Sequence, residues 1–404
     1  MNSMTTTLDT LSLPWQIRPL VAVLGRIAKG TLELTTPEGY QLRFGDGGEP
    51  WADLQLTDWT ALRRIFRSGD VGLAECYRDG LVTSNNLTAL MRLGIQNQEA
   101  LDKAIHGSRL LTLGYRIRHL LRFNSRRGSA QNIGFHYDLG NDFYRLWLDP
   151  SMSYSSARFD SGHTEDLEQG QQAKYRRMVD FAGARPGDSV LEIGCGWGGF
   201  AEHAARQGIH VQGVTVSREQ LSFARERLSR AGLASLAELE LRDYRDIHGS
   251  YDHIVSIEML EAVGERYWQA YFGKLNALLN PGGRAAIQTI VIDDAHFERY
   301  RRGTDFIQQY IFPGGMLPSP VKLREMAAAS GFRIGRFESF GGDYAETLRR
   351  WSRSFEDNLE QVRQQGFDDQ FIRLWRLYLA YCEAGFDEGR INVVQLQLIK
   401  DRAL

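Results

Sequence analysis

The chain has 404 residues, of which 43% are hydrophobic and 24% charged, and its formal net charge is −2 at pH 7. This composition is typical of a globular protein of two or three domains, and the near-neutral charge argues against general nucleic-acid binding. The three cysteines are far apart in the sequence, so we expect a reducing compartment and no metal centre. The sequence shows neither a signal-peptide pattern nor an apolar run long enough to span a bilayer. Any membrane contact is therefore expected to be peripheral.

Residues 1–100 mix two kinds of pattern. Short alternating runs, as in TLELTTPEGYQLRF (31–44), predict strands, whereas TDWTALRRIFRSG (57–69) predicts an amphipathic helix. We therefore expect a small N-terminal α+β domain.

A basic segment follows at residues 103–127, and no acidic residue occurs between Asp102 and Asp138. Leucines recur between its cations at roughly helical spacing, which is typical of a basic amphipathic helix. Such a helix suits an anionic membrane surface, where each cation contributes about 1 kcal/mol. A solvated linker helix between domains is an equal alternative. We expect residues 1–128 to form a lipid- or membrane-engaging domain that ends in this segment. Its cations are Lys103, Arg109, Arg116, Arg118, Arg122, Arg126 and Arg127.

From Gln131 the pattern becomes regular, with predicted strands and amphipathic helices in alternation. Such alternation implies a doubly wound parallel sheet, so we expect residues 129–404 to form a Rossmann-like α/β domain. The region after Tyr344 is mostly helical in pattern, with a last strand at INVVQLQLI (391–399). The predicted strands are 188–194, 209–216, 238–243, 251–258 and 284–292, and the predicted helices are 164–182, 200–207, 217–232 and 265–279.

The stretch VLEIGCGWGGF (190–200) places an apolar strand before a glycine-rich loop and a helix start. Glycines let the backbone pass close under a ligand, and the N–H groups of a helix start favour carboxylate or phosphate. The loop fits both G-x-G-x-x-G and the acidic-x-G-x-G-x-G pattern of methyltransferases. By itself it therefore leaves the cofactor open.

Two further strand ends bear on the choice of cofactor. The second strand ends in GVTVS (213–217), without the acidic residue that usually holds the ribose of a nicotinamide cofactor, which weakens that interpretation. The third strand ends in RDYRD (242–246), where an acidic group could accept from an adenine amino group and an aromatic ring could stack on it. A solvated, charged loop is the alternative for this run.

Six motifs then follow one another along the chain: HYDLGNDFYRLWLDPSMSYSSARF (136–159), LEIGCGWGGFA (191–201), GVTVSREQ (213–220), DYRDI (243–247), IVSIEMLEAVG (254–264) and YIFPGGMLPS (310–319). In this order and spacing they resemble the cyclopropane fatty acid synthase family, which includes the mycolic acid cyclopropane synthases. The resemblance covers residues 130–404 and extends more faintly to GLAECYRDG (72–80).

The resemblance implies a class I S-adenosylmethionine methyltransferase fold and an S-adenosylmethionine-dependent enzyme. Its reaction would deliver a methylene across the cis double bond of an acyl chain in a membrane phospholipid, giving a cyclopropane fatty acid. We therefore expect a cytoplasmic protein that is peripheral at the inner face of an anionic membrane. Its partner would be unsaturated phospholipid, and a homodimer, as known in the family, is an open option. A small-molecule methyltransferase and a lipid-binding module without catalysis are the alternatives.

The resemblance also implies the residues that bind the cofactor. Loop glycines and an acidic residue serve its methionine part, over which two tyrosines and a serine close, and two further pairs serve the ribose and the adenine. For the two tyrosines, ordinary aromatic packing is the alternative. The methionine part is served by Gly194, Gly196, Gly198 and Glu192 and covered by Tyr137, Tyr154 and Ser155. The ribose is served by Thr215 and Gln220 and the adenine by Asp243 and Tyr244, and a further cofactor-binding residue is Ser217.

In the family, a bound bicarbonate takes a proton from the new methyl group and is held by a Cys, a Glu, a His, an Ile backbone group and a Tyr. Glu261, Ile290 and Tyr344 match three of these positions, whereas Ser156 stands in place of the Cys and Gln288 in place of the His. Serine and glutamine can still donate hydrogen bonds to an anion. Bicarbonate therefore remains a candidate ligand at an altered site.

The acyl carbocation of this reaction needs aromatic faces nearby, and Tyr310, Phe312 and Tyr344 are the candidates. Glu258 occupies a position where many members have Gly, and its charge would weaken anion binding. Slow proton loss would let a hydride shift move the cation first, giving a methylene- or methyl-branched chain. Cyclopropanation is the expected outcome, and the branched product is the alternative.

Overall fold

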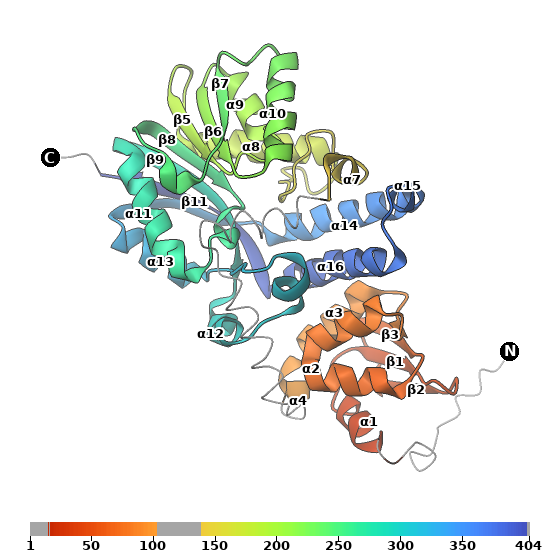
Figure 1. Cartoon of the computed structure of the whole chain (residues 1–404). Helices are drawn as coiled ribbons and strands as arrows, with labels where there is room; N and C mark the ends of the chain where they lie inside the picture. Colours follow the sequence, from red (N-terminus) through yellow and green to blue (C-terminus); the bar gives the residue numbers. More distant parts are fainter. Residues whose placement is uncertain (1–14, 16, 103–138, 402–404) are drawn as a thin grey trace. The chain divides into compact units, whose positions relative to one another are not determined.

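The computed structural model describes residues 15, 17–102 and 139–401 (Figure 1). The basic segment and Tyr137 lie outside the described residues. The chain forms two compact units, and residues 303–311 and 363–390 belong to the same unit as the N-terminal part. This division differs from the single predicted boundary at residue 128, because two later segments join the N-terminal unit.

The first unit contains a small sheet and several helices. Its strands are β1 (Thr31–Thr35), β2 (Gln41–Gly45), β3 (Trp51–Leu56) and β4 (Val82–Thr83), and its helices are α1 (Arg18–Leu24), α2 (Trp59–Arg78), α3 (Leu87–Gln96), α4 (Gln98–Asp102), the π-helical turn η5 (Ile307–Ile311) and α16 (Asp369–Asp387). The strand order is β2-β1-β3-β4, with β1 antiparallel to β2 and parallel to β3. Leu34 and Leu54 pair across β1 and β3 on the buried face. The predicted α+β domain is confirmed.

Helix α16 is joined to α2 and α3 by hydrogen bonds between residues far apart in the sequence. The Tyr381 hydroxyl donates to Asp70 Oδ2 at 3.0 Å, and Arg92 Nε donates to Glu388 Oε1 at 2.6 Å. Asp70 follows Gly69, where a φ of 60° interrupts α2. The N-terminal unit is thus completed by a helix from near the other end of the described chain.

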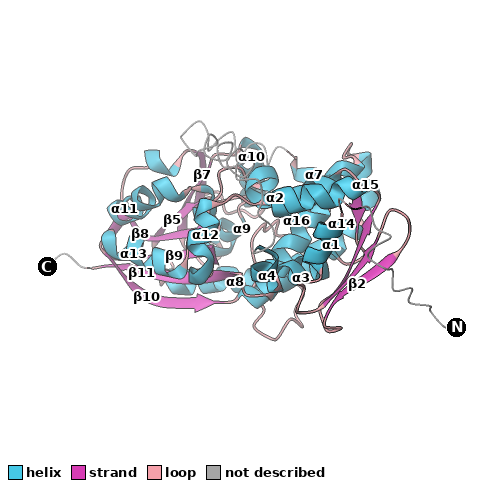
Figure 2. Cartoon of the chain, turned by 90° about the horizontal axis from the view of Figure 1, so that it is seen from below, coloured by secondary structure: helices cyan, strands magenta, loops and turns pink. Residues whose placement is uncertain are grey.

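The second unit is built on a seven-stranded sheet with helices along it (Figures 1 and 2). Its strands are β5 (Ser189–Ile193), β6 (His210–Thr215), β7 (Ala237–Leu241), β8 (Tyr251–Ile257), β9 (Leu279–Ile292), β10 (Phe332–Ser339) and β11 (Ile391–Lys400). Its helices are α7 (Asn141–Arg145), α8 (Leu167–Ala182), α9 (Gly199–Ala205), α10 (Arg218–Arg230), α11 (Trp268–Leu278), α12 (Asp294–Arg302), α13 (Pro320–Ala329) and α14 (Gly341–Asp357), and α15 (Leu359–Gln364) leads on to α16. The short turns are η2 (Tyr244–Asp246), η3 (Leu260–Ala262) and η4 (Glu265–Tyr267).

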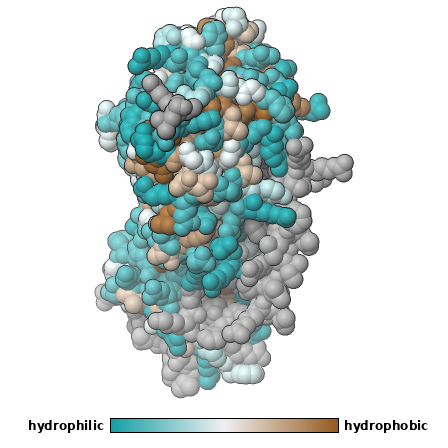
Figure 3. Space-filling model, turned by 90° about the vertical axis from the view of Figure 1, so that its left-hand side faces the viewer, coloured by the Kyte–Doolittle hydropathy of each residue, from teal (hydrophilic) through white to brown (hydrophobic). Residues whose placement is uncertain are grey.

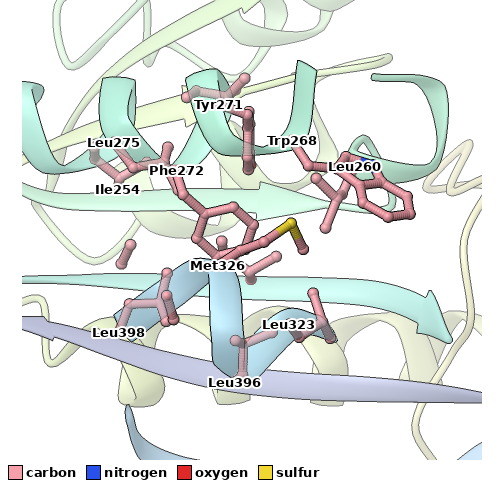
Figure 4. Packing of buried hydrophobic residues seen from close by; sticks show 14 of the residues in the cluster. Ile254, Leu260, Trp268, Tyr271, Phe272, Leu275, Leu323, Met326, Leu396 and Leu398 are labelled. Carbon is pink, nitrogen blue, oxygen red and sulfur yellow. The ribbon is translucent and has the colours of Figure 1, made fainter. Parts of the chain in front are cut away.

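Two hydrophobic clusters cover the two faces of this sheet. Val190 and Leu191 belong to different clusters because successive strand residues point to opposite faces. One cluster contains residues of α8, α9 and α10, and the other contains residues of α11 and α13. Figure 4 shows the second cluster, in which Phe272 and Met326 from the two helices point toward one another. The unit is a three-layer α/β/α sandwich, which confirms the predicted Rossmann-like fold.

The strand order β10-β11-β9-β8-β5-β6-β7 positions the site. From β5 the chain runs to β6 and β7 on one side, and then to β8 and β9 on the other. Parallel strands whose connections diverge in this way leave a crevice at their carboxyl ends, where α/β proteins bind ligands. Glu192, Thr215 and Glu258 stand at or just beyond the carboxyl ends of β5, β6 and β8.

In the described ranges, every helix is too short or too polar to cross a membrane. On the face shown in Figure 3, the described surface is mainly hydrophilic, with apolar residues gathered in small patches. Large apolar side chains that are exposed in the described part include Trp15, Trp51 and Val321.

Candidate active site

The glycine loop joins β5 to α9 and adopts a backbone that requires glycine. Gly194, Gly196 and Gly198 have φ angles of 85°, 49° and 81°, a region that residues with a Cβ avoid. A Cβ on Gly194 would lie 3.0 Å from Met259 Cγ, and one on Gly198 would lie 2.9 Å from Ala224 Cβ. The loop therefore requires glycine for its backbone conformation and, at Gly194 and Gly198, for its packing against Met259 and Ala224. Its contact with a cofactor stays a prediction.

Glu192 lies directly before this loop on β5 and is 3% exposed. Burial raises the pKa of its carboxyl to about 8, against the opposing charge of Lys174. Its Oε2 atom has no hydrogen-bond partner among the described residues. Because a buried oxygen without a donor is costly, the position fits a ligand that brings its own donor. The ammonium group of S-adenosylmethionine is such a donor.

Thr215, Ser217 and Gln220 form a hydrogen-bonded group where β6 leads into α10. Thr215 Oγ1 donates to Gln220 Oε1 at 3.1 Å and accepts from the Ser217 backbone N–H at 3.1 Å. Ser217 Oγ in turn accepts from the Gln220 backbone N–H at 3.3 Å and caps α10. The structure brings these three predicted residues together in a nearly buried group of hydroxyls and an amide, which is chemistry suited to a ribose.

Asp243 and Tyr244 form a fixed corner after β7. The Asp243 carboxylate accepts from the backbone N–H and the Nε of Arg245 at 2.9 Å and 2.8 Å. The Tyr244 ring packs edge-on against Tyr271, with ring centroids 5.4 Å apart. Burial raises the pKa of Tyr244 to about 12, so its hydroxyl stays protonated at neutral pH. Their contact with an adenine stays a prediction.

Tyr154 and Ser155 lie in the segment between α7 and α8. The Tyr154 ring is surrounded by Tyr144, Trp147 and Trp351, with centroid distances of 5.5, 5.4 and 5.4 Å. This cluster gives Tyr154 the aromatic packing that was the alternative to a cofactor contact. It also provides an apolar wall beside the predicted site.

The carboxylate of Glu258 accepts hydrogen bonds from three predicted site residues. Its Oε1 accepts from the Ser156 backbone N–H at 2.9 Å and from Gln288 Nε2 at 2.8 Å. Its Oε2 accepts from the Tyr344 hydroxyl at 2.6 Å. Desolvation raises the pKa of the Glu258 carboxyl, and these hydrogen bonds together with the charge of Lys174 oppose that shift. Three segments far apart in the sequence therefore converge on this one carboxylate.

Glu261 lies beside this group in η3. Its Oε1 accepts from the Ile290 backbone N–H and from Thr289 Oγ1, whereas its Oε2 has no partner among the described residues. Burial and the nearby charge of Glu258 raise the pKa of Glu261 to about 8. Burial raises the pKa of both carboxyl groups, and the three donors that face Glu258 favour placing the negative charge on Glu258 and the proton on Glu261.

Two predicted anion contacts are directed elsewhere. The Ser156 hydroxyl donates to Ala157 O at 2.8 Å, so Ser156 reaches the site only through its backbone N–H. The Ile290 backbone N–H donates to Glu261. The donors expected to hold bicarbonate thus bind carboxyl groups of the chain itself. In this arrangement the residues do not fit an additional bicarbonate.

The predicted aromatic residues are divided between the two units. Tyr344 on α14 is 6% exposed and packs edge-on against Trp351. Phe312 belongs to the same unit, with its ring 6.4 Å from that of Tyr154. Tyr310 belongs to the first unit, where its hydroxyl donates to Glu75 at 2.7 Å.

Sequence reasoning missed two buried polar residues at the site. Gln395 on β11 donates to Gln288 Oε1 at 2.8 Å and so fixes which way the Gln288 amide faces. Lys174 on α8 is fully buried and donates to Ser155 Oγ at 2.6 Å. The signal for Gln395 was a polar residue inside the apolar run VVQLQLI. Lys174 gave no signal, because lysine is ordinary in a helix that also contains two arginines.

The chain is similar to known proteins over most of its length. The family model for mycolic acid cyclopropane synthetase matches residues 124–396. Tuberculostearic acid methyltransferase UfaA1 of Mycobacterium tuberculosis is 40% identical over 393 residues, which cover 94% of this chain and 91% of that protein. Cyclopropane-fatty-acyl-phospholipid synthase of Escherichia coli is 33% identical over 365 residues, covering 87% and 88%. The crystal structure of mycolic acid cyclopropane synthase CmaA1, complexed with SAH and CTAB, has a TM-score of 0.63 at 30% identity, covering 67% of this chain and 98% of that one.

Proposed function

Because the chain belongs to the mycolic acid cyclopropane synthetase family and is an S-adenosylmethionine-dependent fatty acid methyltransferase, we propose that it methylates the cis double bond of an unsaturated phospholipid acyl chain and leaves a methylene branch. The observation that carries this proposal is the Glu258 carboxylate, which takes hydrogen bonds from donors expected to hold bicarbonate. Of the two relatives described above, the one with the higher identity is named as a methyltransferase, which supports the same outcome.

The bound cofactor supplies an electrophilic methyl group on a sulfonium. The chain must hold a weakly nucleophilic double bond in line with that methyl group and exclude water, and such positioning contributes roughly 7–11 kcal/mol. The half-buried ring of Tyr154, backed by the buried rings of Trp147 and Trp351, offers the acyl chain an apolar surface. The electron pair of the double bond would form the new C–C bond while the bond from sulfur to the methyl group breaks and its electron pair stays on sulfur, which leaves positive charge on the neighbouring acyl carbon. The ring of Tyr344 can stabilise that charge.

Glu258 then acts as the proton acceptor. A 1,2-hydride shift converts the secondary cation into a more stable tertiary cation at the methylated carbon. The Glu258 carboxylate takes one proton from the new methyl group, and the electron pair of that C–H bond forms the C=CH₂ double bond of the methylene branch. Glu261, whose pKa is raised to about 8, already carries a proton at neutral pH. The three donors that face Glu258 favour its charged form as the proton acceptor.

Ring closure is the second candidate, and the presence of Glu261, Ile290 and Tyr344 favours it. In this case the methyl proton leaves before the hydride shift, and the freed electron pair closes onto the secondary cation. The two outcomes differ in whether proton transfer or hydride shift is faster. A carboxylate tethered to the backbone and held by three donors is less free to reach the methyl group than a bound bicarbonate, which favours the branch.

The test is expression in a bacterial host that makes unsaturated fatty acids, followed by gas chromatography–mass spectrometry of the phospholipid fatty acids. Both candidates add one CH₂ to the unsaturated chain, so mild catalytic hydrogenation separates them. A methylene branch takes up two hydrogens, whereas a ring does not. We expect a product that takes up hydrogen and is absent from the empty-vector host.

A product that resists hydrogenation and gives the upfield proton signals of a cyclopropane would contradict the branched product and support ring closure. Unchanged phospholipid fatty acids, with methyl transfer to small molecules in the same extract, would contradict both candidates.

A further inference from the structure

Lys174 is a fully buried lysine whose contacts all lie beside the predicted cofactor residues. Its Nζ donates to Ser155 Oγ and to Gln171 Oε1, each at 2.6 Å, and lies 4.5 Å from the ring centroid of Tyr175. It makes no ion pair in the described part of the chain. A buried cation without a direct counter-ion is costly, so its presence at this position calls for a physical reason.

The bond to Ser155 determines which way the serine hydroxyl can donate. An ammonium group has only donors, so Ser155 Oγ must be the acceptor, and its own hydrogen points to some other group. No described residue accepts that hydrogen. Ser155 is 7% exposed, and a buried hydroxyl is expected to find an acceptor. Among the described residues this donor is open, which fits a ligand that brings an acceptor to Ser155.

Gln171 holds the same segment from the same face of α8. Its Nε2 donates to Ser155 O at 2.9 Å, and its Oε1 accepts from Lys174. Gln171 and Lys174 are three residues apart on α8 and thus share one helix face. Together they fix both the backbone and the side chain of Ser155.

The charges that face Lys174 come from three other segments. They are Glu192 on β5, Glu258 after β8 and Asp149 after α7. Glu192 has an oxygen that lacks a donor, and Ser155 has a donor that lacks an acceptor. A ligand with an ammonium group and a carboxylate on one carbon would satisfy both.

We propose that Lys174 is a positioning residue that, through Ser155, prepares a hydrogen-bond donor and a buried positive charge for the carboxylate end of S-adenosylmethionine. The α-ammonium group of the same ligand then meets Glu192. The inference deepens the proposed function and takes from it only the identity of the ligand. The lipid substrate and the ring-or-branch question do not enter it.

The experiment measures binding of two ligands by isothermal titration calorimetry without lipid. One is S-adenosylmethionine, and the other is decarboxylated S-adenosylmethionine, which keeps the ammonium and sulfonium groups and lacks the carboxylate. In the wild type the carboxylate is expected to improve Kd by about 10- to 100-fold, the range for a hydrogen bond to a charged group. In Lys174→Met this preference should fall to within about threefold, with the Kd for the decarboxylated ligand little changed.

Lys174→Gln is the companion variant, because it keeps a donor for Ser155 without the charge and retains a side chain that can be buried. We expect it to retain an intermediate preference. In the double variant Lys174→Met, Ser155→Ala, the second substitution should add little, since both act on the same contact. Circular dichroism and thermal melting report whether each variant is folded.

The pH dependence of the preference for the carboxylate ligand separates a positioning role of Lys174 from a purely structural one, which would leave this dependence unchanged. Burial lowers the pKa of Lys174 to about 8, so the preference for the carboxylate ligand should decline above pH 8 in the wild type. The decline should be smaller in Lys174→Met. Glu192 and the ligand ammonium groups are the same in both proteins, so the difference between the two pH profiles reports Lys174.

A folded Lys174→Met or Lys174→Gln variant with the wild-type preference would overturn the inference, as would a lower melting temperature with an unchanged ratio of Kd values. Failure of the wild type to bind either ligand would instead overturn the proposed function, which keeps the two failures apart.

Discussion

Glu258 combines a strained backbone conformation with a carboxylate that we propose as the proton acceptor. Its φ of 50° lies in the left-handed region, which costs a non-glycine residue about 1–2 kcal/mol. The three hydrogen bonds to its carboxylate offset that cost and hold the side chain over the strand ends. A glycine at this position would remove both the strain and the internal anion, leaving three donors directed at a carboxylate-sized space.

Replacing Glu258 by Gly should therefore remove the carboxylate base and leave a space in which added bicarbonate can bind and act as the base. In bicarbonate-free buffer we expect turnover to fall at least about tenfold, since general-base catalysis is usually worth about 10²–10⁴. Added bicarbonate should restore part of it and raise the share of ring product. The measurement is product formation on unsaturated phospholipid vesicles at rising bicarbonate concentration.

Glu258→Gln is the matched control, because it removes the charge and keeps the volume. It should lose turnover without rescue by bicarbonate. Equal rescue of both variants, or wild-type turnover in either, would show that Glu258 does not occupy the base position.

The same residues show why the sequence could predict which side chains meet at the site and not how they are connected. Glu261, Gln288 and Tyr344 were identified from motifs, and the structure brings them together. The direction of each donor depends on φ at Glu258 and on the pairing of β9 with β11, which sequence patterns do not contain. Tyr310, predicted as an aromatic candidate for the carbocation, donates its hydroxyl to Glu75 within the first unit, and its role stays a prediction.

At the scale of elements, the β5–loop–α9 unit was predictable because its signals are local. Apolar strand residues, glycines and a resumed helical period follow one another within a dozen positions. The end of α8 was also predicted correctly, and its start at Leu167 is set by the capping box of Asp166 and Gln169. β9 begins at Leu279, earlier than the predicted residue 284, because Pro281, Gly282 and Gly283 are themselves part of the strand.

The glycine loop allows a test in which strain and steric contact are separated. Gly198→Ala combines a φ of 81° with a Cβ 2.9 Å from Ala224 Cβ, so we expect it to destabilise the protein by about 2–4 kcal/mol and weaken S-adenosylmethionine binding at least about tenfold. Gly196→Ala has a φ of 49° and no atom within 4 Å of the new Cβ. It should cost only the backbone strain, about 1–2 kcal/mol.

Urea unfolding and calorimetric titration of both variants provide the measurement. Equal losses of stability in the two would mean that the contact with Ala224 does not matter, and that backbone strain alone explains the glycine.

For the whole molecule, buried carboxyl groups set the pH dependence of stability. Burial raises the pKa of Glu192 and Glu261 to about 8 and that of Asp305 to about 7. Between the unfolded pKa near 4.5 and these values, the unfolded chain has lost protons that the folded chain retains. Stability therefore falls as pH rises through this range. His203, whose pKa burial lowers to about 4, opposes the trend only below about pH 6.5.

We expect the melting temperature to decline from pH 6.5 to pH 8, as followed by circular dichroism. Glu261→Gln should make the decline shallower, since glutamine stays neutral throughout, whereas Glu226→Gln on the exposed side of α10 should leave it unchanged. A melting temperature that rises across this range in the wild type would contradict the raised pKa values.

The basic segment provides the second test at this scale. We propose that it docks the protein on anionic phospholipid, and reversing Arg116, Arg118 and Arg122 to Glu should reduce co-sedimentation with anionic vesicles by at least about fivefold at low salt. The effect should shrink at high salt. Reversal of three exposed arginines elsewhere changes the net charge equally and serves as the control; these are Arg206, Arg230 and Arg302. An equal loss in both triple variants would assign the effect to net charge alone.

Helix α16 has a consequence for the order of events during synthesis. Its Tyr381 and the Asp70 that it contacts are 311 residues apart, a distance that a ribosome covers in roughly 15–60 s at 5–20 residues per second. Until then the apolar faces of α2 and α3 lack the helix that they pack against. We expect chaperones to bind these exposed faces during synthesis. The part of the protein made first is thus among the last to be completed.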